Sequence, residues 1–471
     1  MNSLMRRKVL DLDAVAPEHR LQRTLSWWHL VALGVGAIVG TGIYTLIGVG
    51  AGMAGPAVVV SFGIAGLICA FTALAYAEVA TMIPASGSSY TYSYVVLGEI
   101  IAWVVGWSLI LEYSLVVSAV AVGWSGYAVG FLHAMGVDLP TALTAGPHAG
   151  GIVNLPAVAI TGLITWMMVV GLRESATFNA VLVVIKIAAL AVFAAVALPH
   201  FDAANFHPFM PHGFASHKID GVQHGVMAAA AIIFFAFYGF DAISTAAEEA
   251  KKPERDLPVG IIGSMLACTA IYVVVAAAAV GAMPYGQFAK SPEPLAMIVR
   301  QLGSPQLAAV VAAAAVIALP TVLLGFLYGQ TRIFFVMARD GFLPMSLAKV
   351  NPKTGTPARI TVVTGVLVAI LAGIVPLEEI AALANAGTLL AFIAVSVCLL
   401  VLRKTKPDQP RIYRTPLAWV VAPVAIVGCV YLFFSLPEKT RLFFFAWNGV
   451  GLAWYLAQHA YRSRRRAAAE G

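Results

Sequence analysis

Two apolar segments of this chain are each interrupted near their middle by glycine and small polar residues. The first reads LGVGAIVGTGI over residues 33–43, and the second reads FFAFYGFDAIS over residues 234–244. A helix in hydrocarbon keeps its backbone hydrogen bonds internal, so unwinding is tolerated only beside protein or a water-filled cavity. Two interrupted spans at matching places in two halves of a chain indicate a transporter's binding site.

The first interruption offers backbone N–H groups. Gly36 and Gly40 fit the small-xxx-small pattern that lets helices pack closely, but packing alone hardly explains Gly34 and Gly42 together with Thr41. An opened turn exposes the amides of Gly40, Thr41 and Gly42 at the positive end of the following helix, which attracts a carboxylate. The Thr41 hydroxyl adds a donor. A nucleotide site is rejected, because its glycines would have to follow a strand.

The second interruption offers carbonyl oxygens. Unwinding near Phe235–Gly239 frees oxygens at the negative end of a helix, which suits an ammonium group. Amides facing carbonyls complement a zwitterion, and a free α-amino acid carries its two charges on adjacent carbons. Tyr238 and Phe240 either cover the substrate side chain or pack in the core. Asp241 is a candidate supporting or gating residue, although capping of the resumed helix is slightly favoured.

Three ionisable residues lie within apolar segments. A charge at the depth of Lys186 costs on the order of 2.5–3.5 kcal/mol on insertion scales, and burial disfavours the charged form of lysine. Such a group can gain and lose a proton at working pH, so proton coupling is favoured over a structural role. Glu112 is either a functional group or a protonated partner within the bundle. Glu78 lies nearer the cytoplasmic end, where gating or packing is favoured.

The elements that must position these residues are membrane-spanning helices. The chain has 471 residues, of which 60% are hydrophobic and 11% charged, with a mean hydropathy of +0.87. A soluble domain is about half apolar and a quarter charged, and one bilayer crossing needs about 20 apolar residues. Twelve crossings are predicted, at 28–50, 57–83, 100–131, 155–172, 178–198, 224–246, 259–283, 306–338, 359–375, 378–402, 417–436 and 441–461.

Lysine and arginine are distributed as expected for a chain with both termini in the cytoplasm. In that orientation 22 of the 29 lie in cytoplasmic segments and 5 in outer segments, while Lys186 and Arg332 lie within helices. The net charge of +7 is therefore a sign of topology and needs no nucleic-acid partner. Because the first 25 residues are charged rather than apolar, the first crossing is expected to direct insertion in place of a cleaved signal peptide.

We predict an all-α integral membrane protein in which residues 28–198 and 224–402 form two inverted five-helix repeats, each broken in its leading helix. Residues 1–27 and 462–471 are expected in the cytoplasm, and residues 417–461 are expected to pack peripherally or to mediate dimerisation. The four cysteines are scattered through apolar segments and show neither a metal-binding spacing nor a disulfide framework. The spans contain no constellation typical of an enzyme.

Several motifs resemble the amino acid–polyamine–organocation (APC) superfamily. They are GVGAIVGTGI at 34–43, AYAE at 75–78, PASGSSY at 84–90 and FFAFYGFD at 234–241. Further motifs resemble its cationic amino acid transporter (CAT) branch of bacterial type, namely Glu248-Glu249, YGQTRI at 328–333 and RDG at 339–341. The resemblance covers nearly the whole chain.

This resemblance implies a LeuT-like fold of 12 transmembrane helices, with helices 1 and 6 broken and with alternating access. The residues that it assigns to the substrate carboxylate are Ile38, Gly40, Thr41 and Gly42, and those assigned to the amine are Phe235, Ala236 and Tyr238, with Gly239 beside them. Lys186 matches the fifth-helix lysine that replaces sodium in proton-coupled relatives. We therefore expect the proton as coupling ion, no sodium, no metal and no cofactor. Glu112 matches an acidic third-helix position.

Together these observations predict a secondary transporter that imports L-amino acids across the bacterial inner membrane by proton symport. Phe326, Leu327 and Tyr328 near the expected pocket are apolar or aromatic, which favours small or branched neutral substrates. The alternatives are an amino acid exchanger and a cationic amino acid permease, and a channel or nutrient receptor is less favoured. The expected partners are the substrate and membrane lipids; the sequence specifies neither a small membrane subunit nor a homo-oligomer.

Overall fold

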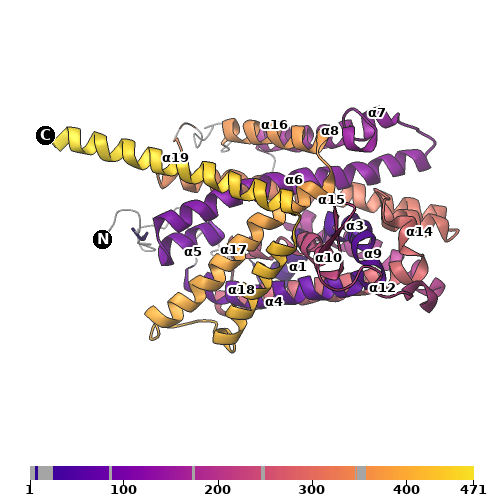
Figure 1. Cartoon of the computed structure of the whole chain (residues 1–471), viewed down its shortest axis with the longest axis horizontal. Coiled ribbons are helices and arrows are strands. Elements are labelled where there is room, and N and C mark those ends of the chain that lie inside the picture. The colour runs from indigo at the N-terminus through magenta and orange to yellow at the C-terminus, as the bar shows by residue number, and fades with distance from the viewer. Residues whose placement is uncertain are drawn as a thin grey trace.

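The computed structural model describes residues 6–8, 25–83, 87–171, 176–245, 250–344, 346 and 357–470. Over these ranges the chain is almost entirely helical, and its one sheet is an antiparallel hairpin of β1 (His217–Ile219) and β2 (Val222–His224). Long helices such as α4, α6 and α12 run along the long axis of the molecule (Figure 1). The prediction of an all-α membrane protein is confirmed at this level.

The helices before the hairpin are α1 (Trp27–Ile38), α2 (Thr41–Tyr44), α3 (Leu46–Ala54), η3 (Gly55–Ala57), α4 (Val58–Met82), α5 (Ser88–Val96), α6 (Glu99–Ala134), α7 (Thr141–Thr144), η4 (Pro147–Ala149), α8 (Leu155–Val170), α9 (Ala176–Ala197), η5 (Leu198–His200) and η6 (Ala203–Phe206). Those after it are α10 (Val226–Ile233), η7 (Phe234–Phe237), α11 (Phe240–Thr245), α12 (Pro253–Ala282), α13 (Tyr285–Phe288), α14 (Pro294–Gln301), α15 (Pro305–Arg339), α16 (Ala358–Ile374), α17 (Leu377–Thr405), α18 (Ala418–Ser435) and α19 (Glu438–Glu470). The predicted crossings 28–50 and 224–246 are thus each divided among three short elements.

Seven helices in the described part of the chain are long and apolar enough to cross a membrane, and four shorter helices are also apolar. Large apolar side chains on α18 stay exposed, among them Trp419, Val427 and Phe434. Exposed apolar surface of this kind is expected where a helix faces lipid. The chain is therefore a multi-pass membrane protein.

Local sequence explains where individual helices begin and end. α8 starts after Asn154, whose side chain accepts a hydrogen bond from the amide of Ala157 at 3.2 Å, as an N-cap residue does. It stops at Gly171, which adopts the left-handed conformation that commonly ends helices (φ +85°). α12 begins with Pro253, which fits a first helical turn because its missing N–H would have no partner there.

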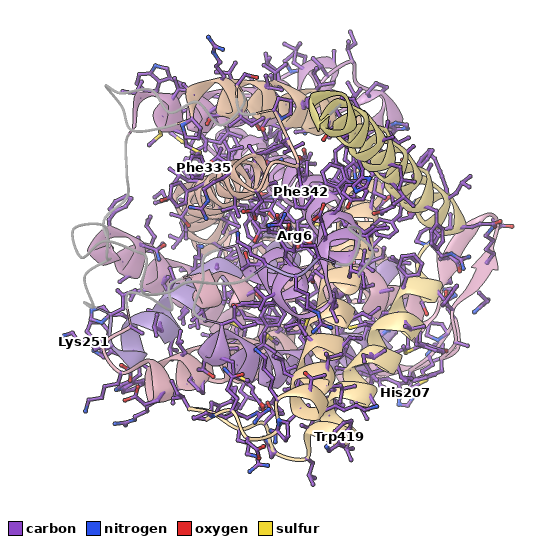
Figure 2. The ribbon with its side chains drawn as sticks, turned by 90° about the vertical axis from the view of Figure 1, so that its left-hand side faces the viewer. Arg6, His207, Lys251, Phe335, Phe342 and Trp419 are labelled. Carbon is purple, nitrogen blue, oxygen red and sulfur yellow. The ribbon has the colours of Figure 1, made fainter. Side chains whose placement is uncertain are left out.

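One end of the bundle holds the N-terminal residues that the structure describes. The Lys8 ammonium contacts both oxygens of Asp340, just after α15, at 2.7 and 2.8 Å, and the Tyr90 hydroxyl donates to the same carboxylate at 2.8 Å. In Figure 2, Arg6 and Phe342 lie near the middle of this end, with Lys251 and Trp419 at its edge. Asp340 thus holds the N-terminal segment against the end of α15.

Candidate functional site

The first helix is interrupted inside the segment that the glycines predicted. α1 ends at Ile38 and α2 begins at Thr41, while Val39 and Gly40 between them are extended. Thr41 and Gly42 stand in the first turn of α2, so their amides have no acceptor within that helix. Thr41 is 1% exposed, and its buried hydroxyl finds no hydrogen-bond partner among the described residues. These groups form a buried set of donors.

The second interruption has a different geometry. α10 ends at Ile233, a 3₁₀ turn follows, and Tyr238 is extended before α11 begins at Phe240. Gly239 has a φ of +110°, which L side chains rarely adopt. A Cβ atom there would also lie 2.6 Å from the Cβ of Ala37, so glycine is required twice over.

The two interruptions touch each other. A Cβ atom on Gly42 would overlap the Cα of Ala236, which means that α2 and η7 cross with their backbones in contact. Segments almost two hundred residues apart in the sequence are thereby brought together. Their crossing brings the residues of the two interruptions next to each other.

A small cavity lies between the broken segments. Six of the eight predicted binding residues line it, namely Ile38, Gly40, Thr41, Gly42, Phe235 and Tyr238. Ala236 and Gly239 do not line it, because they form the contact between the broken helices described above. The predicted binding roles themselves remain predictions.

The rest of the cavity wall is apolar. It consists of Ala37 with Val116 and Val120 from α6 and Val322 and Phe326 from α15. Of these, sequence reasoning named only Phe326. Val116 with Val120, and Val322 with Phe326, are spaced four residues apart, so each pair presents one face of its helix. That spacing would have identified the wall once one residue of each helix was placed.

The predicted neighbours of Phe326 do not share its position. Leu327 is fully buried but does not line the cavity, and Tyr328 is 38% exposed. Successive residues of a helix point about 100° apart, so only one of three consecutive residues can face a small cavity. This part of the pocket prediction is therefore corrected to Phe326 and Val322.

Lys186 lies beside the first interruption, on α9. It is 1% exposed, and its ammonium donates to the carbonyl of Gly36 at 2.7 Å and contacts the hydroxyl of Thr321 at 3.1 Å. Gly36 belongs to the last turn of α1, whose carbonyls lack partners within the helix. The structure therefore brings the candidate coupling residue into direct contact with the broken helix.

Tyrosine hydroxyls satisfy further backbone groups around this interruption. Tyr272 on α12 donates to the carbonyl of Ile38 at 2.8 Å, and Tyr127 on α6 donates to that of Tyr44 at 2.6 Å. Tyr44 in turn donates to the carbonyl of Lys186 at 2.9 Å. The first interruption is thus fixed by side chains from α6, α9 and α12.

Neither Glu112 nor Asp241 lines the cavity. Glu112 is 3% exposed and packs against Gly387 of α17, and one of its oxygens has no hydrogen-bond partner within the described ranges. Asp241 accepts from the Tyr113 hydroxyl at 3.4 Å. These positions are compatible with the predicted supporting roles and do not indicate direct substrate contact.

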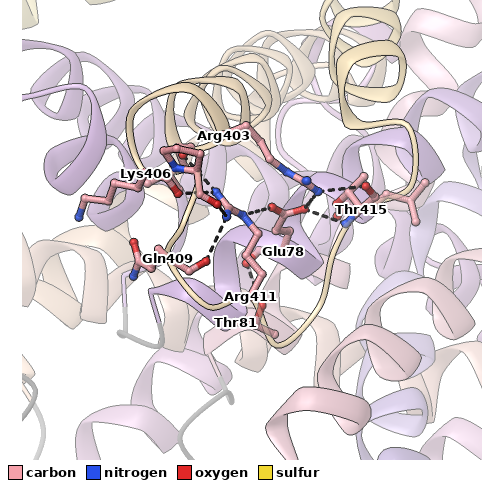
Figure 3. Close-up of polar contacts among 10 residues, drawn as sticks. Glu78, Thr81, Arg403, Lys406, Gln409, Arg411 and Thr415 are labelled. Carbon is pink, nitrogen blue, oxygen red and sulfur yellow. Dashed lines mark hydrogen bonds and ion pairs between the residues drawn. The ribbon is translucent and has the colours of Figure 1, made fainter.

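Glu78 belongs to a separate buried network at the end of α4 (Figure 3). Its carboxylate is fully buried and accepts from Arg403 at 2.7 Å, from Arg411 at 2.9 Å and from the amide of Thr415 at 2.7 Å. A buried carboxylate is tolerated only with such partners. This network joins α4 to the end of α17 and to the segment before α18, so Glu78 holds helices together and is not part of the cavity.

A further buried carboxylate precedes α14, outside the apolar helices. Glu293 contacts Arg300 at 2.8 Å, while its other oxygen lies under Gly130 without a hydrogen-bond partner in the described residues. Burial raises the pKa of the Glu293 carboxyl, and the hydrogen bond and charge of Arg300 partly oppose that shift.

Comparison with known proteins places this site in context. Residues 25–453 match the family model of amino acid permeases. The chain is 45% identical over 459 residues to the branched-chain amino acid permease BcaP of Bacillus subtilis, covering 96% of this chain and 97% of that protein. It is 42% identical over 459 residues to the methylthioribose transporter of Bacillus subtilis, covering 97% of each.

A plant relative shows how far the similarity extends. The chain is 36% identical over 416 residues to the vacuolar cationic amino acid transporter 4 of Arabidopsis thaliana, covering 87% of this chain and 68% of that protein. Glu248 and Glu249, which carried part of the resemblance to cationic amino acid transporters, lie outside the described residues.

Proposed function

This chain is a member of the amino acid permease family, within the APC superfamily, and we propose that it imports branched-chain and other small neutral L-amino acids by proton symport. The observation that carries the proposal is the cavity between the two interruptions. It combines the amides of Gly40, Thr41 and Gly42 with an apolar wall and contains no charged side chain in its lining. The amino acid backbone would bind at the interruptions and its side chain at the wall.

The cavity wall supports a neutral, compact side chain. Val116, Val120, Val322 and Phe326 would bury a branched aliphatic group, at about 25 cal/mol per Å² of apolar surface. The distal ammonium of lysine would find no acceptor there, and burying an unpaired charge is strongly unfavourable.

A sugar is the alternative that one relative suggests. Methylthioribose is a neutral molecule, whereas the first interruption offers amides at a helix N-terminus and a buried hydroxyl without a partner. Such a donor set is suited to a negative charge. This arrangement favours an α-amino acid over a neutral sugar as the substrate.

For the architecture we propose twelve crossings in two inverted five-helix repeats of the LeuT type, with both termini in the cytoplasm. The interruptions fall in the first and sixth predicted crossings, which supports this arrangement. A short parallel bridge between Leu25 and Ala250 also joins the segment before α1 to the segment after α11. The start of the first broken segment and the end of the second therefore meet at one end of the bundle.

Lys186 supports the assignment of the proton as coupling ion. Its side-chain nitrogen is buried between α1 and α15 and is hydrogen-bonded to Gly36 and Thr321, so it links the two helices. Loss of its proton would weaken both contacts, because neutral lysine is a poorer donor. Protonation of Lys186 would then favour the conformation in which its side chain contacts both Gly36 and Thr321.

The proposal is tested by uptake of labelled leucine into proteoliposomes with an inward proton gradient. With one proton per substrate, a gradient of one pH unit, about 1.36 kcal/mol, would drive at most about tenfold accumulation. Lysine and methylthioribose serve as competitors, and we expect both to compete at least about 100-fold more weakly, or about 2.7 kcal/mol. Protein-free liposomes are the control.

Three outcomes would contradict parts of the proposal. Accumulation that survives collapse of the gradient by a protonophore would remove proton symport. Uptake that occurs only when an unlabelled amino acid is present inside would identify an exchanger. Strong competition by lysine or by methylthioribose would overturn the assignment of neutral amino acids.

A further inference from the structure

We infer that Asn385 of α17 is a positioning residue for the binding site, which holds the second interruption open and orients Tyr238 at the cavity. Asn385 is fully buried. Its amide nitrogen donates to the carbonyls of Ala231 at 2.6 Å and Ile232 at 3.0 Å, and its amide oxygen accepts from the hydroxyl of Tyr238. Both donor hydrogens and the acceptor of this side chain are therefore used on one broken helix.

The need for such a residue follows from the backbone. α10 ends at Ile233 and the chain tightens into a 3₁₀ turn, in which the amide of Phe234 reaches the carbonyl of Ile232. Ala231 and Ile232 lie in the last turn of α10, where the regular i→i−4 partners run out. Both are fully or almost fully buried in an apolar bundle, where water cannot replace a missing donor. Asn385 supplies two donors from a single side chain and so allows the helix to end at that point.

The same side chain determines the orientation of Tyr238. Tyr238 lines the cavity, and its ring packs against that of Phe235, with the ring centres 5.0 Å apart. Its hydroxyl is held from behind by Asn385, which does not itself line the cavity. Asn385 therefore acts on a substrate only through Tyr238 and the α10 backbone.

Asn385 occupies the counterpart of the position of Lys186. Gly36, which accepts from Lys186, is two residues before the end of α1, and Ala231, which accepts from Asn385, is two residues before the end of α10. α9 and α17 contain the fifth and tenth of the proposed crossings, so the correspondence rests on the proposed inverted repeat. One interruption is held by a side chain that can lose a proton, and the other by an amide that cannot.

This difference makes Asn385→Asp a sharp test. A carboxylic acid at this position can still donate to one carbonyl and accept from Tyr238. A carboxylate cannot donate, and it would face the oxygens of Ala231 and Ile232. The other titratable groups that interact electrostatically with Tyr238 are Glu112, Asp241 and Cys69, and all of them are unchanged in the variant.

The experiment measures leucine affinity and exchange at equal pH on both sides of the membrane, from pH 5 to 8. For Asn385→Asp we expect near-normal affinity at the acidic end and at least a tenfold loss toward pH 8, relative to the unsubstituted protein at each pH. Asn385→Ala should weaken affinity tenfold or more at every pH. Ser396→Ala is the matched control, because Ser396 is also buried on α17 and its hydroxyl has no hydrogen-bond partner in the described part of the chain.

Tyr238→Phe separates positioning from general packing. If Asn385 acts through Tyr238, the affinity losses of Asn385→Ala and Tyr238→Phe will be less than additive in the double variant. A pH profile of Asn385→Asp identical to that of the unsubstituted protein would overturn the inference, as would fully additive losses. Should Asn385→Ala fail to fold, the Asn385→Asp profile and the Tyr238→Phe affinity still decide the matter.

Failure of the proposed function can be distinguished from failure of this inference. The thermal unfolding midpoint of Asn385→Asp without substrate should fall, relative to that of the unsubstituted protein, as the pH rises from 5 to 8. That measurement needs no knowledge of the substrate. A normal midpoint profile would contradict the role of Asn385 at α10, whether or not leucine is transported.

Discussion

At the first interruption the carbonyl of Gly36 accepts from the ammonium of Lys186, whereas at the second the carbonyl of Ala231 accepts from the amide of Asn385. Both partners are buried and both reach the last turn of a helix that stops in mid-span. Residues at the N-terminus of α2 line the cavity at the first interruption, and Tyr238, an aromatic side chain held by a hydrogen bond, lines it at the second. In both halves of the site a buried side chain donates to the last turn of a helix, but the donor is a lysine in one half and an asparagine in the other.

The difference suggests a division of tasks. A lysine contact can be made and broken by protonation, so the first interruption is suited to coupling. An asparagine contact is insensitive to pH, so the second is suited to keeping a fixed surface for the substrate. Each prediction below alters one side of this comparison, beginning with the largest expected effect.

Gly42→Val is expected to abolish leucine binding and uptake. A Cβ atom at Gly42 overlaps the backbone of Ala236, and backbone cannot move aside as a flexible side chain can. The two interruptions would be forced apart, and the cavity between them would lose its shape. Labelled-leucine uptake measures the effect, and Gly63→Ala, at a site on α4 with no atom within 4 Å of the added carbon, is the control. Normal uptake by Gly42→Val would show that the crossing is not needed.

Lys186→Met is expected to abolish accumulation driven by a pH gradient while exchange at equal pH persists. The methionine side chain is one heavy atom shorter than that of lysine and has no N–H group to donate to Gly36 and Thr321. Accumulation should fall to the level reached without a gradient. The exposed Lys439→Met is the control. Gradient-driven accumulation that persists in Lys186→Met would remove the distinction between the two interruptions.

Tyr272→Phe should produce a smaller loss confined to affinity. It removes the donor to the carbonyl of Ile38, and an unsatisfied buried group costs about 1–3 kcal/mol. Since Ile38 lines the cavity, we expect leucine to bind about tenfold more weakly, equivalent to about 1.4 kcal/mol. The gradient dependence should be unchanged, because Lys186 is intact. Isothermal titration measures the affinity, with Tyr431→Phe on the exposed face of α18 as the control.

Glu293→Gln should have the smallest effect and should spare transport. Because burial raises the pKa of Glu293, the folded protein binds this proton more tightly than the unfolded chain does. The stability gained from the protonated form is therefore lost as the pH rises from about 4.5 through the folded-state pKa. Glutamine imitates the protonated form, so the variant should melt slightly higher at pH 7 and no higher at pH 4, as measured by thermal unfolding.

A transport assay on Glu293→Gln tests whether a carboxyl group away from the two interruptions contributes to proton coupling. The pH dependence of leucine uptake by Glu293→Gln should match that of the unsubstituted protein. A shifted uptake profile would mean that a carboxyl group away from the interruptions contributes to coupling, and Lys186 could no longer be its single source.

Much of the site follows from local sequence. Glycines at 36, 40 and 42 within an apolar run, and the Tyr238-Gly239 pair within another, predict where helices stop, because backbone conformation is decided by adjacent residues. A lysine in the middle of an apolar stretch, such as Lys186, can likewise be recognised from the sequence, because a charge at that depth of the membrane is energetically unfavourable. For these features the sequence was sufficient.

Other features were decided only when distant segments came together. Asn385 reaches a carbonyl 154 positions away, and Glu78 meets Arg403 across 325 positions. Whether Phe326 or Leu327 faces the cavity depends on how α15 is rotated against α6. Hydropathy does not predict that rotation, because both residues are apolar. The sequence alone therefore determined a membrane protein with two interrupted helices and a buried lysine. The tertiary structure decided which side chains contact the two interruptions, because a contact between helices is set by their relative rotation and not by the composition of either.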